Sequence, residues 1–180
     1  MPVKQSARIA FGGIMTALAL TFLLFTISPL ATVALAALAG VCGLPVVVEL
    51  GKKAGLVHYV ATALIALLLI PAPEGKVMYT AFFGYYTILK AWIEPKNLPA
   101  TLEWGVKLGV FLVGLGVGGG TLYFLLEPAF PDWFALWMIP AGVVALCVVF
   151  VVYDIGLTRL VGVYFTKLRP HLQKVFRFPQ

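Results

Sequence analysis

The chain of 180 residues has few charged side chains, and this shortage excludes a soluble globular protein. Only 11% of the residues are Asp, Glu, Lys or Arg, whereas soluble domains carry about 25%. Hydrophobic residues make up 62% of the chain, and the mean hydropathy is +1.02. The composition therefore predicts an integral membrane protein, and it leaves no room for a separate soluble domain.

Histidine and cysteine are also scarce, which argues against metal and redox chemistry. The two histidines, His58 and His171, are too few for a histidine-rich metal site. Cys42 and Cys147 lie inside apolar runs without C-x-x-C spacing, so we expect them to pack as small residues. The seven carboxylates are scattered, and none is three or four residues from another. We therefore predict no cofactor, no metal site and no enzyme activity.

Long apolar runs separated by short gaps dominate the sequence. A helix needs about 20 apolar residues to cross the hydrocarbon core of a bilayer. The runs lack the period-two alternation of a β-barrel strand. We therefore predict an all-α integral membrane protein, a compact bundle of six transmembrane helices (residues 1–165) followed by a basic cytoplasmic tail (residues 166–180). The runs are residues 9–27, 30–50, 55–71, 76–94, 100–126 and 133–158.

Positive charge is concentrated before the first run and in every second gap after it. Short loops rich in Lys and Arg remain on the cytoplasmic side, so we predict a multi-pass protein of the cell membrane with both termini cytoplasmic. The net charge of +6 follows from this orientation and suggests contact with membrane lipids rather than with nucleic acid. The clustered cations are Lys4 and Arg8 before the first run, Lys52 and Lys53 between the second and third, Lys90 and Lys96 between the fourth and fifth, and Arg159, Lys167, Arg169, Lys174 and Arg177 after the sixth. The remaining gaps hold one cation, Lys76, and the carboxylates Glu74, Glu127 and Asp132.

Three polar residues inside the apolar runs have expected structural roles. Glu49 and Asp154 lie toward the cytoplasmic ends of their runs, where a carboxylate can reach the headgroups. Alternatively, pairing with Lys52, Lys53 or Arg159 would compensate the charge of these carboxylates equally well. We expect His58 to be a packed, hydrogen-bonded side chain rather than a proton carrier.

Small residues predict close helix packing in two runs. Gly13 and Ala17 stand four residues apart in the first run, and residues 114–120 contain five glycines. In lipid, such faces let helices approach closely. The glycines of the fifth run also fit G-x-G-x-x-G, but no strand precedes them, so a nucleotide site is not predicted. Because the first run is at the edge of the array, Gly13 and Ala17 are the better candidates for binding a partner subunit.

Aromatic, hydroxyl and acidic side chains gather in the outer halves of the last three runs. Tyr79, Phe82, Phe83 and Tyr86 are spaced three and four residues apart and so share one helix face. An apolar cavity with a few polar groups is typical of a small-molecule site. The alternative is that this face is bundle core and interfacial belt. The candidate substrate-binding residues are Tyr79, Phe82, Phe83, Tyr86, Thr121, Tyr123, Glu127, Trp133 and Trp137.

Two short segments carry a resemblance to a known family. The small-residue helix of residues 10–19 and the tight turn of residues 49–56, with its Gly-Lys-Lys-Ala-Gly sequence, are similar to features of one transporter family. The chain resembles a substrate-binding (S) component of the energy-coupling factor transporters. In that family an Ala-x-x-x-Ala face of the first helix docks onto a transmembrane coupling subunit, and Gly13-x-x-x-Ala17 would take its place here.

The resemblance implies uptake of a small vitamin-like or micronutrient solute. A coupling subunit and two ATPase subunits would supply the energy, since this chain has no P-loop. An alternative from another class is a non-transporting scaffold or accessory subunit of a larger complex. A lipid-modifying enzyme would need a carboxylate or histidine cluster at one interface, which the sequence lacks.

Overall fold

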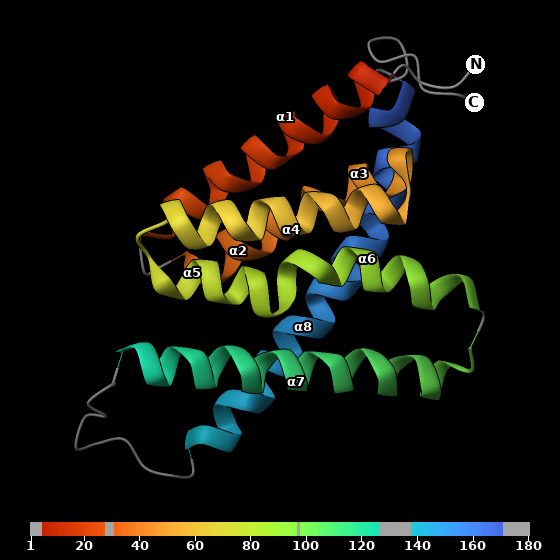
Figure 1. The fold of residues 1–180 in the computed structure, drawn as a ribbon. Coiled ribbons are helices and arrows are strands. Elements are labelled where there is room, and N and C mark those ends of the chain that lie inside the picture. The colour runs from red at the N-terminus through yellow and green to blue at the C-terminus, as the bar shows by residue number, and fades with distance from the viewer. Residues whose placement is uncertain (1–4, 28–30, 97, 127–137, 171–180) are drawn as a thin grey trace.

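A computed structural model describes residues 5–27, 31–96, 98–126 and 138–170, and every regular element in these ranges is helical. The all-α fold is therefore confirmed for the described part of the chain (Figure 1). The longer elements are α1 (Gln5–Leu24), α2 (Thr32–Val41), α3 (Gly43–Leu50), α4 (Lys52–Leu69), α5 (Pro73–Met78), α6 (Gly84–Ile93), α7 (Ala100–Leu126) and α8 (Met138–Val163). Short helical turns complete them, namely η1 (Phe25–Ile27), η2 (Tyr79–Phe83), η3 (Glu94–Lys96) and η4 (Tyr164–Leu168).

Five helical stretches in the described ranges are long and apolar enough to cross a membrane. This matches the prediction of an integral membrane protein. The stretches are Gln5–Ile27, Thr32–Leu50, Lys52–Leu69, Ala100–Leu125 and Pro140–Leu168.

The fourth predicted run has a different character. Its helix continues through α5, η2 and α6 but is not among the five apolar stretches, because tyrosine, threonine and lysine lower its hydropathy. It packs against α2, α3, α4 and α7, and most of its side chains are buried or half-buried. A helix surrounded by others can carry polar side chains, since few of them face lipid.

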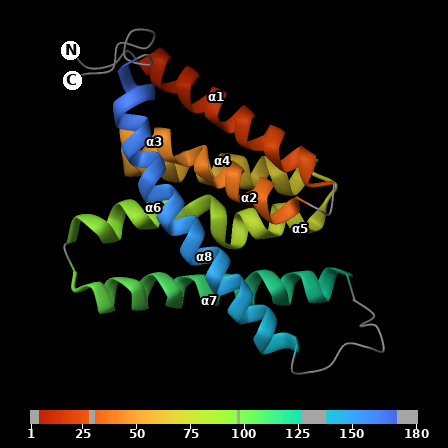
Figure 2. The same ribbon diagram turned by 180° about the vertical axis from the view of Figure 1, so that it is seen from behind.

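The helices form a stack with one oblique member. Figure 1 shows α1, α4, the α5–α6 helix and α7 one below another, with α2 and α3 behind α4. Figure 2, from behind, shows α8 crossing the α5–α6 helix and α7 at an angle. This crossing brings the middle of α8 against both helices.

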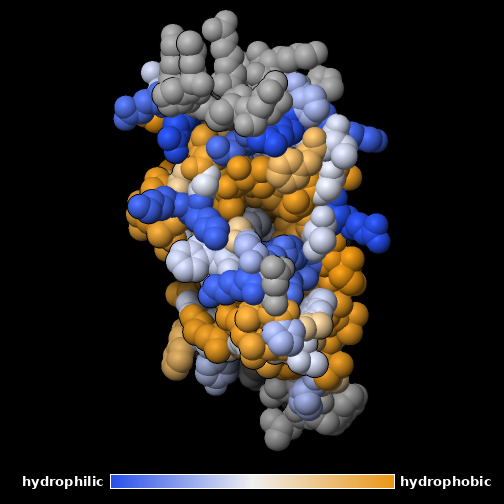
Figure 3. Space-filling model, turned by 90° about the vertical axis from the view of Figure 1, so that its right-hand side faces the viewer, coloured by the Kyte–Doolittle hydropathy of each residue, from blue (hydrophilic) through white to orange (hydrophobic). Residues whose placement is uncertain are grey.

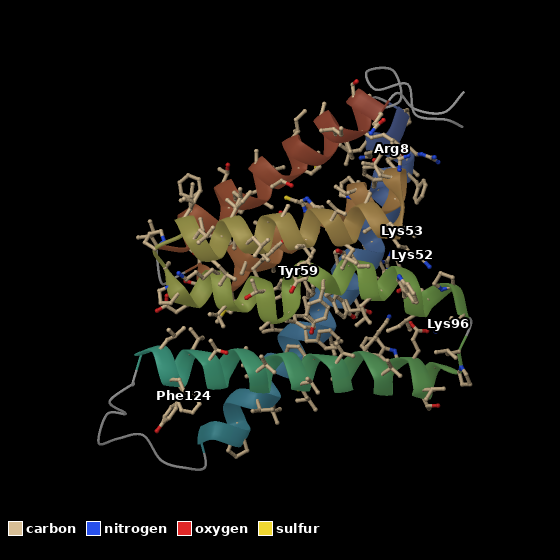
Figure 4. The ribbon with its side chains drawn as sticks, in the orientation of Figure 1. Arg8, Lys52, Lys53, Tyr59, Lys96 and Phe124 are labelled. Atoms are coloured by element: carbon tan, nitrogen blue, oxygen red, sulfur yellow. The ribbon has the colours of Figure 1, made fainter. Side chains whose placement is uncertain are left out.

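Cationic side chains gather at one end of the stack. Arg8, Lys52, Lys53 and Lys96 lie at that end, and Phe124 lies at the other (Figure 4). We call the first the cationic end and the second the far end. Figure 3 looks onto the cationic end, where hydrophilic side chains form bands between hydrophobic flanks.

The first and last described helices both reach the cationic end. The Arg8 guanidinium donates to the carbonyl oxygen of Leu50 at 3.3 Å, and Arg169 pairs with Glu49 at 3.0 Å. The start of α1 and the end of η4 therefore lie beside the end of α3.

Candidate functional site

The middle of α8 contributes a buried carboxylate that holds three side chains. Asp154 accepts hydrogen bonds from Lys90 at 2.7 Å, from Lys107 at 3.2 Å and from the hydroxyl of Tyr86 at 2.7 Å. Lys90, Lys107 and Asp154 are only 4%, 2% and 3% exposed. The contacts connect α8 with α6 and α7. They fix the oblique helix against the stack.

Two further carboxylates complete this group, which we call the ionic cluster (Lys90, Glu94, Glu103, Lys107 and Asp154). Lys107 pairs with Glu103 at 2.7 Å and with Glu94 at 3.3 Å, and Lys90 also pairs with Glu94. The side chains of Glu94 and Glu103 are partly exposed, whereas the other three are buried. A charge buried in a bilayer is costly unless it is paired. Two cations and three carboxylates satisfy one another here.

The ion pairs suggested as an alternative for Glu49 and Asp154 are wrong. Asp154 pairs with Lys90 and Lys107 rather than with Arg159, and Glu49 pairs with Arg169 rather than with Lys52 or Lys53. The physical reason is the helix path. Because α8 continues into η4, as far as Leu168, Asp154 lies well inside the crossing and meets the neighbouring helices there.

Sequence reasoning also placed Lys90 in a loop and overlooked Lys107. Both lie on helices and point into the bundle. Two patterns in the sequence indicate these contacts: Lys90 and Glu94 are four residues apart, and so are Glu103 and Lys107. Such pairs lie on one helix face.

A separate cavity of about 120 Å³ lies toward the far end between α2, the α5–η2 segment, α7 and α8. Phe82 is central to its wall, with ring centroids 5.0 Å from Phe111 and 5.5 Å from Phe150. The walls are apolar; Gly114 and Gly118 of α7 pack closely against Ala81, whereas a Cβ added to Gly119 would meet no atom within 4 Å. The walls comprise Val33, Met78, Ala81, Phe82, Phe83, Phe111, Gly114, Leu115, Gly118, Gly119, Leu122, Leu146, Val149 and Phe150.

Only some of the predicted substrate-binding residues line this cavity. Phe82 and Phe83 line the cavity, whereas Tyr79 and Tyr86 are fully buried and do not. The Tyr86 hydroxyl binds Asp154 instead.

The α7 candidates lie off the cavity wall as well. The Thr121 hydroxyl donates to the carbonyl oxygen of Val117 at 2.8 Å, and Tyr123 is 54% exposed. Glu127, Trp133 and Trp137 lie outside the described residues.

The aromatic segment beside the cavity has an unusual backbone. Residues Tyr79–Phe83 form a single π-helical turn within a longer helix. Such turns are rare and frequently mark functional sites, because they redirect side chains along a helix.

The polar side chain of Tyr153 lies in a groove next to the cavity. The Tyr153 ring lies 5.1 Å from Phe83, and its hydroxyl is buried without a hydrogen-bond partner among the described residues. The hydroxyls of Tyr79 and Thr62 are also buried, but neither side chain lines the cavity or the groove. A groove of about 420 Å³ between α2 and α8 adjoins the cavity at Phe83 and contains Tyr153. Buried polar groups usually have partners, so the Tyr153 hydroxyl is the candidate polar contact for a ligand here.

The two predicted partner-binding residues are exposed on α1. Gly13 lines a groove of about 710 Å³ between α1, α3 and α4, and a Cβ atom added to it would meet no atom within 4 Å. Ala17 is exposed one turn further along. On the groove floor, His58 is buried and its Nδ1 lies 2.9 Å from the Thr16 hydroxyl, as expected for a hydrogen-bonded packing histidine.

No family model matches the chain, and no curated protein or solved structure matches it at a significant level.

Proposed function

We propose that the chain is the solute-binding subunit of a membrane uptake system for a small vitamin-like or micronutrient solute. The cationic end faces the cytoplasm of the cell membrane, since short basic loops are retained there. Both termini are then cytoplasmic, and the far end with its cavity is reached from outside.

The observation that carries this proposal is the cavity beside the π-helical turn. Its apolar wall includes Phe82 and Phe83, and the adjoining groove contains Tyr153, whose buried hydroxyl has no hydrogen-bond partner among the described residues. Small-molecule sites typically have this composition, a mostly apolar wall with a few polar groups that fix orientation.

The cavity limits the size and charge of the solute. Its volume of about 120 Å³ is comparable with the engineered cavity of about 150 Å³ that admits benzene. A larger solute requires the adjoining groove at Phe83 and Tyr153 to open into the same space. Among the residues that the structure describes, no acidic or basic side chain lines either one. A neutral solute with an aromatic or aliphatic ring and a hydroxyl or amide group fits best.

Energy for transport comes from other chains in this proposal. A transmembrane coupling subunit docks on the exposed face of α1 at Gly13 and Ala17, and two ATPase subunits bind that coupling subunit. The solute-binding subunit contributes recognition, and its movement in the membrane delivers the solute to the cytoplasmic side.

Native mass spectrometry of the purified protein tests solute binding. Gly119 lines the cavity, and an added Cβ would meet no atom within 4 Å, so Gly119→Leu fills the space without a clash. We expect wild-type protein to retain a small molecule that Gly119→Leu loses. Gly116→Leu is the matched control because Gly116 is equally open but does not line the cavity. Retention equal in both variants, or no retained molecule in wild type, would contradict the proposal.

A scaffold subunit is the second candidate function. It is favoured by Tyr79 and Tyr86, which are fully buried in helix contacts without lining the cavity. A scaffold would co-purify with the same protein partners in the wild type and in Gly119→Leu and would carry no small molecule in either. Loss of a bound molecule from Gly119→Leu alone excludes this role.

A further inference from the structure

We propose that the groove between α1, α3 and α4 binds an anionic phospholipid from the leaflet at the cationic end. The groove is separate from the solute cavity, so this inference stands whether or not solute binding is confirmed. It shares Gly13 with the proposed docking face for the coupling subunit, so the lipid occupies the groove while that subunit is not docked. Its occupant is a lipid whose phosphate lies at the mouth and whose acyl chain lies along the helices.

The groove has the shape and apolar character that an acyl chain needs. It has a volume of about 710 Å³, and Gly12 and Gly13 form one wall without side chains. In Figure 1, α1 separates from α4 toward the cationic end, the same end at which Arg8 and Leu50 line the groove. The apolar wall residues are Ile9, Val46, Val57 and Ala61.

The mouth of the groove suits a phosphate. Arg8 is exposed there, and its bond to the Leu50 carbonyl at 3.3 Å keeps the guanidinium at the rim. That bond uses one of its five N–H donors. None of the described residues that line the groove is acidic, so the mouth carries positive charge without compensation from these walls.

Two helix starts add to this preference for an anion. Gln5, at the start of α1, and Ala54, in the first turn of α4, both line the groove. The start of α4 has no side-chain cap on its backbone N–H groups, and Lys53 lies in the same turn. Helix N-termini favour negative charge, here next to an arginine.

The charge distribution favours a lipid over a helix of another protein. A transmembrane helix fills an apolar groove but brings no obligatory negative charge to the headgroup level. An anionic phospholipid brings both an apolar chain and a phosphate. Basic pockets between transmembrane helices on the cytoplasmic side bind anionic headgroups in the same way.

Native mass spectrometry with added lipid tests the proposal. Delipidated protein is titrated with phosphatidylglycerol and, separately, with phosphatidylcholine of the same chain length. We expect phosphatidylglycerol to be retained more strongly. Arg8→Gln should lower its retention about five-fold, the equivalent of about 1 kcal/mol per basic residue, and leave phosphatidylcholine unchanged. Gly13→Leu should lower retention of both lipids, because the new side chain occupies the groove.

Two matched variants control for charge and for leucine. Arg159→Gln removes an exposed cation outside the groove, and Gly109→Leu adds leucine at an equally open glycine on α7. Both should retain lipid as the wild type does. Equal retention of the two lipids by the wild type would overturn the proposal, as would an unchanged phosphatidylglycerol signal in both groove variants. Loss of a protein dimer in Gly13→Leu with lipid retention unchanged would also overturn it and would assign the groove to a second copy.

Discussion

The two halves of the bundle use their interiors in opposite ways. Toward the cationic end, Lys90, Lys107 and Asp154 are buried and satisfied by one another. Toward the far end, aromatic rings and glycines enclose an apolar space. In a bilayer an unpaired charge costs far more free energy than a small apolar void. The buried charges must therefore all be paired, whereas the apolar half can contain some empty space.

We therefore expect the two halves of the bundle to have different roles, one in stability and one in ligand binding. The ionic cluster joins three helices whose sequence positions are far apart, so it stabilises the assembly of α6, α7 and α8. The far half has the open volume and the unpartnered Tyr153 hydroxyl that recognition requires. Substitutions in the ionic cluster should therefore change stability, and substitutions at the cavity should change ligand retention.

Removing the central carboxylate should have the largest effect. Asp154→Ala leaves two buried lysines with only the partly exposed Glu94 and Glu103 as partners. We expect a loss of about 3 kcal/mol in the free energy of unfolding, as for a broken buried ion pair. Unfolding in detergent micelles measures it. Arg159→Ala, an exposed change on the same helix, should stay within about 0.5 kcal/mol of wild type.

Replacing a charged pair by apolar side chains should restore part of that loss. The double variant Lys90→Met with Asp154→Leu leaves Lys107 to the two glutamates and removes one buried charge of each sign. A double-mutant cycle should give a coupling free energy of about 1–3 kcal/mol. Strict additivity would show that Lys90 and Asp154 do not stabilise each other.

Filling the cavity should raise the free energy of unfolding, by less than Asp154→Ala lowers it. Gly119→Leu and Gly116→Leu gain the same helix propensity, so their difference isolates the cavity. We expect Gly119→Leu to be more stable by about 1 kcal/mol, because side chains facing a void regain contacts. A less stable Gly119→Leu would indicate that the space is not available to a side chain.

Removing the Tyr86 hydroxyl should have the smallest effect on stability. Tyr86→Phe removes the hydrogen bond to Asp154 and keeps the ring contacts. Hydrogen bonds between transmembrane helices contribute about 0.6 kcal/mol on average, so we expect a loss of that order in thermal unfolding. A loss above about 2 kcal/mol would mean that Tyr86 is as important to the cluster as the lysines.

The apolar runs predicted the helical fold well. The run of residues 100–126 agrees closely with the span Ala100–Leu125, and the run of residues 9–27 ends with the span Gln5–Ile27 but begins four residues later. Likewise, the pattern of lysine and arginine predicted which loops share an end, as Arg8, Lys52 and Lys96 show.

The contacts within the bundle could not be predicted in the same way. Asp154 is 64 residues from Lys90 and 47 from Lys107, so no local spacing reveals their contact. The aromatic face at Tyr79–Tyr86 was predicted as one surface, but the π-helical turn places Phe82 and Phe83 at the cavity and Tyr79 and Tyr86 elsewhere. Both outcomes depend on how neighbouring helices cross, which a single sequence does not encode locally.

Cysteine labelling in intact cells tests the central claim, that the cationic end is cytoplasmic and the cavity end faces outward. The background carries Cys42→Ala and Cys147→Ala, and single cysteines are placed by Lys53→Cys at the cationic end or by Glu74→Cys at the start of α5. A membrane-impermeant maleimide should label the Glu74→Cys protein in intact cells and the Lys53→Cys protein only after lysis. The reverse pattern, or labelling of both positions from outside, would contradict the orientation and with it the proposed route of the solute.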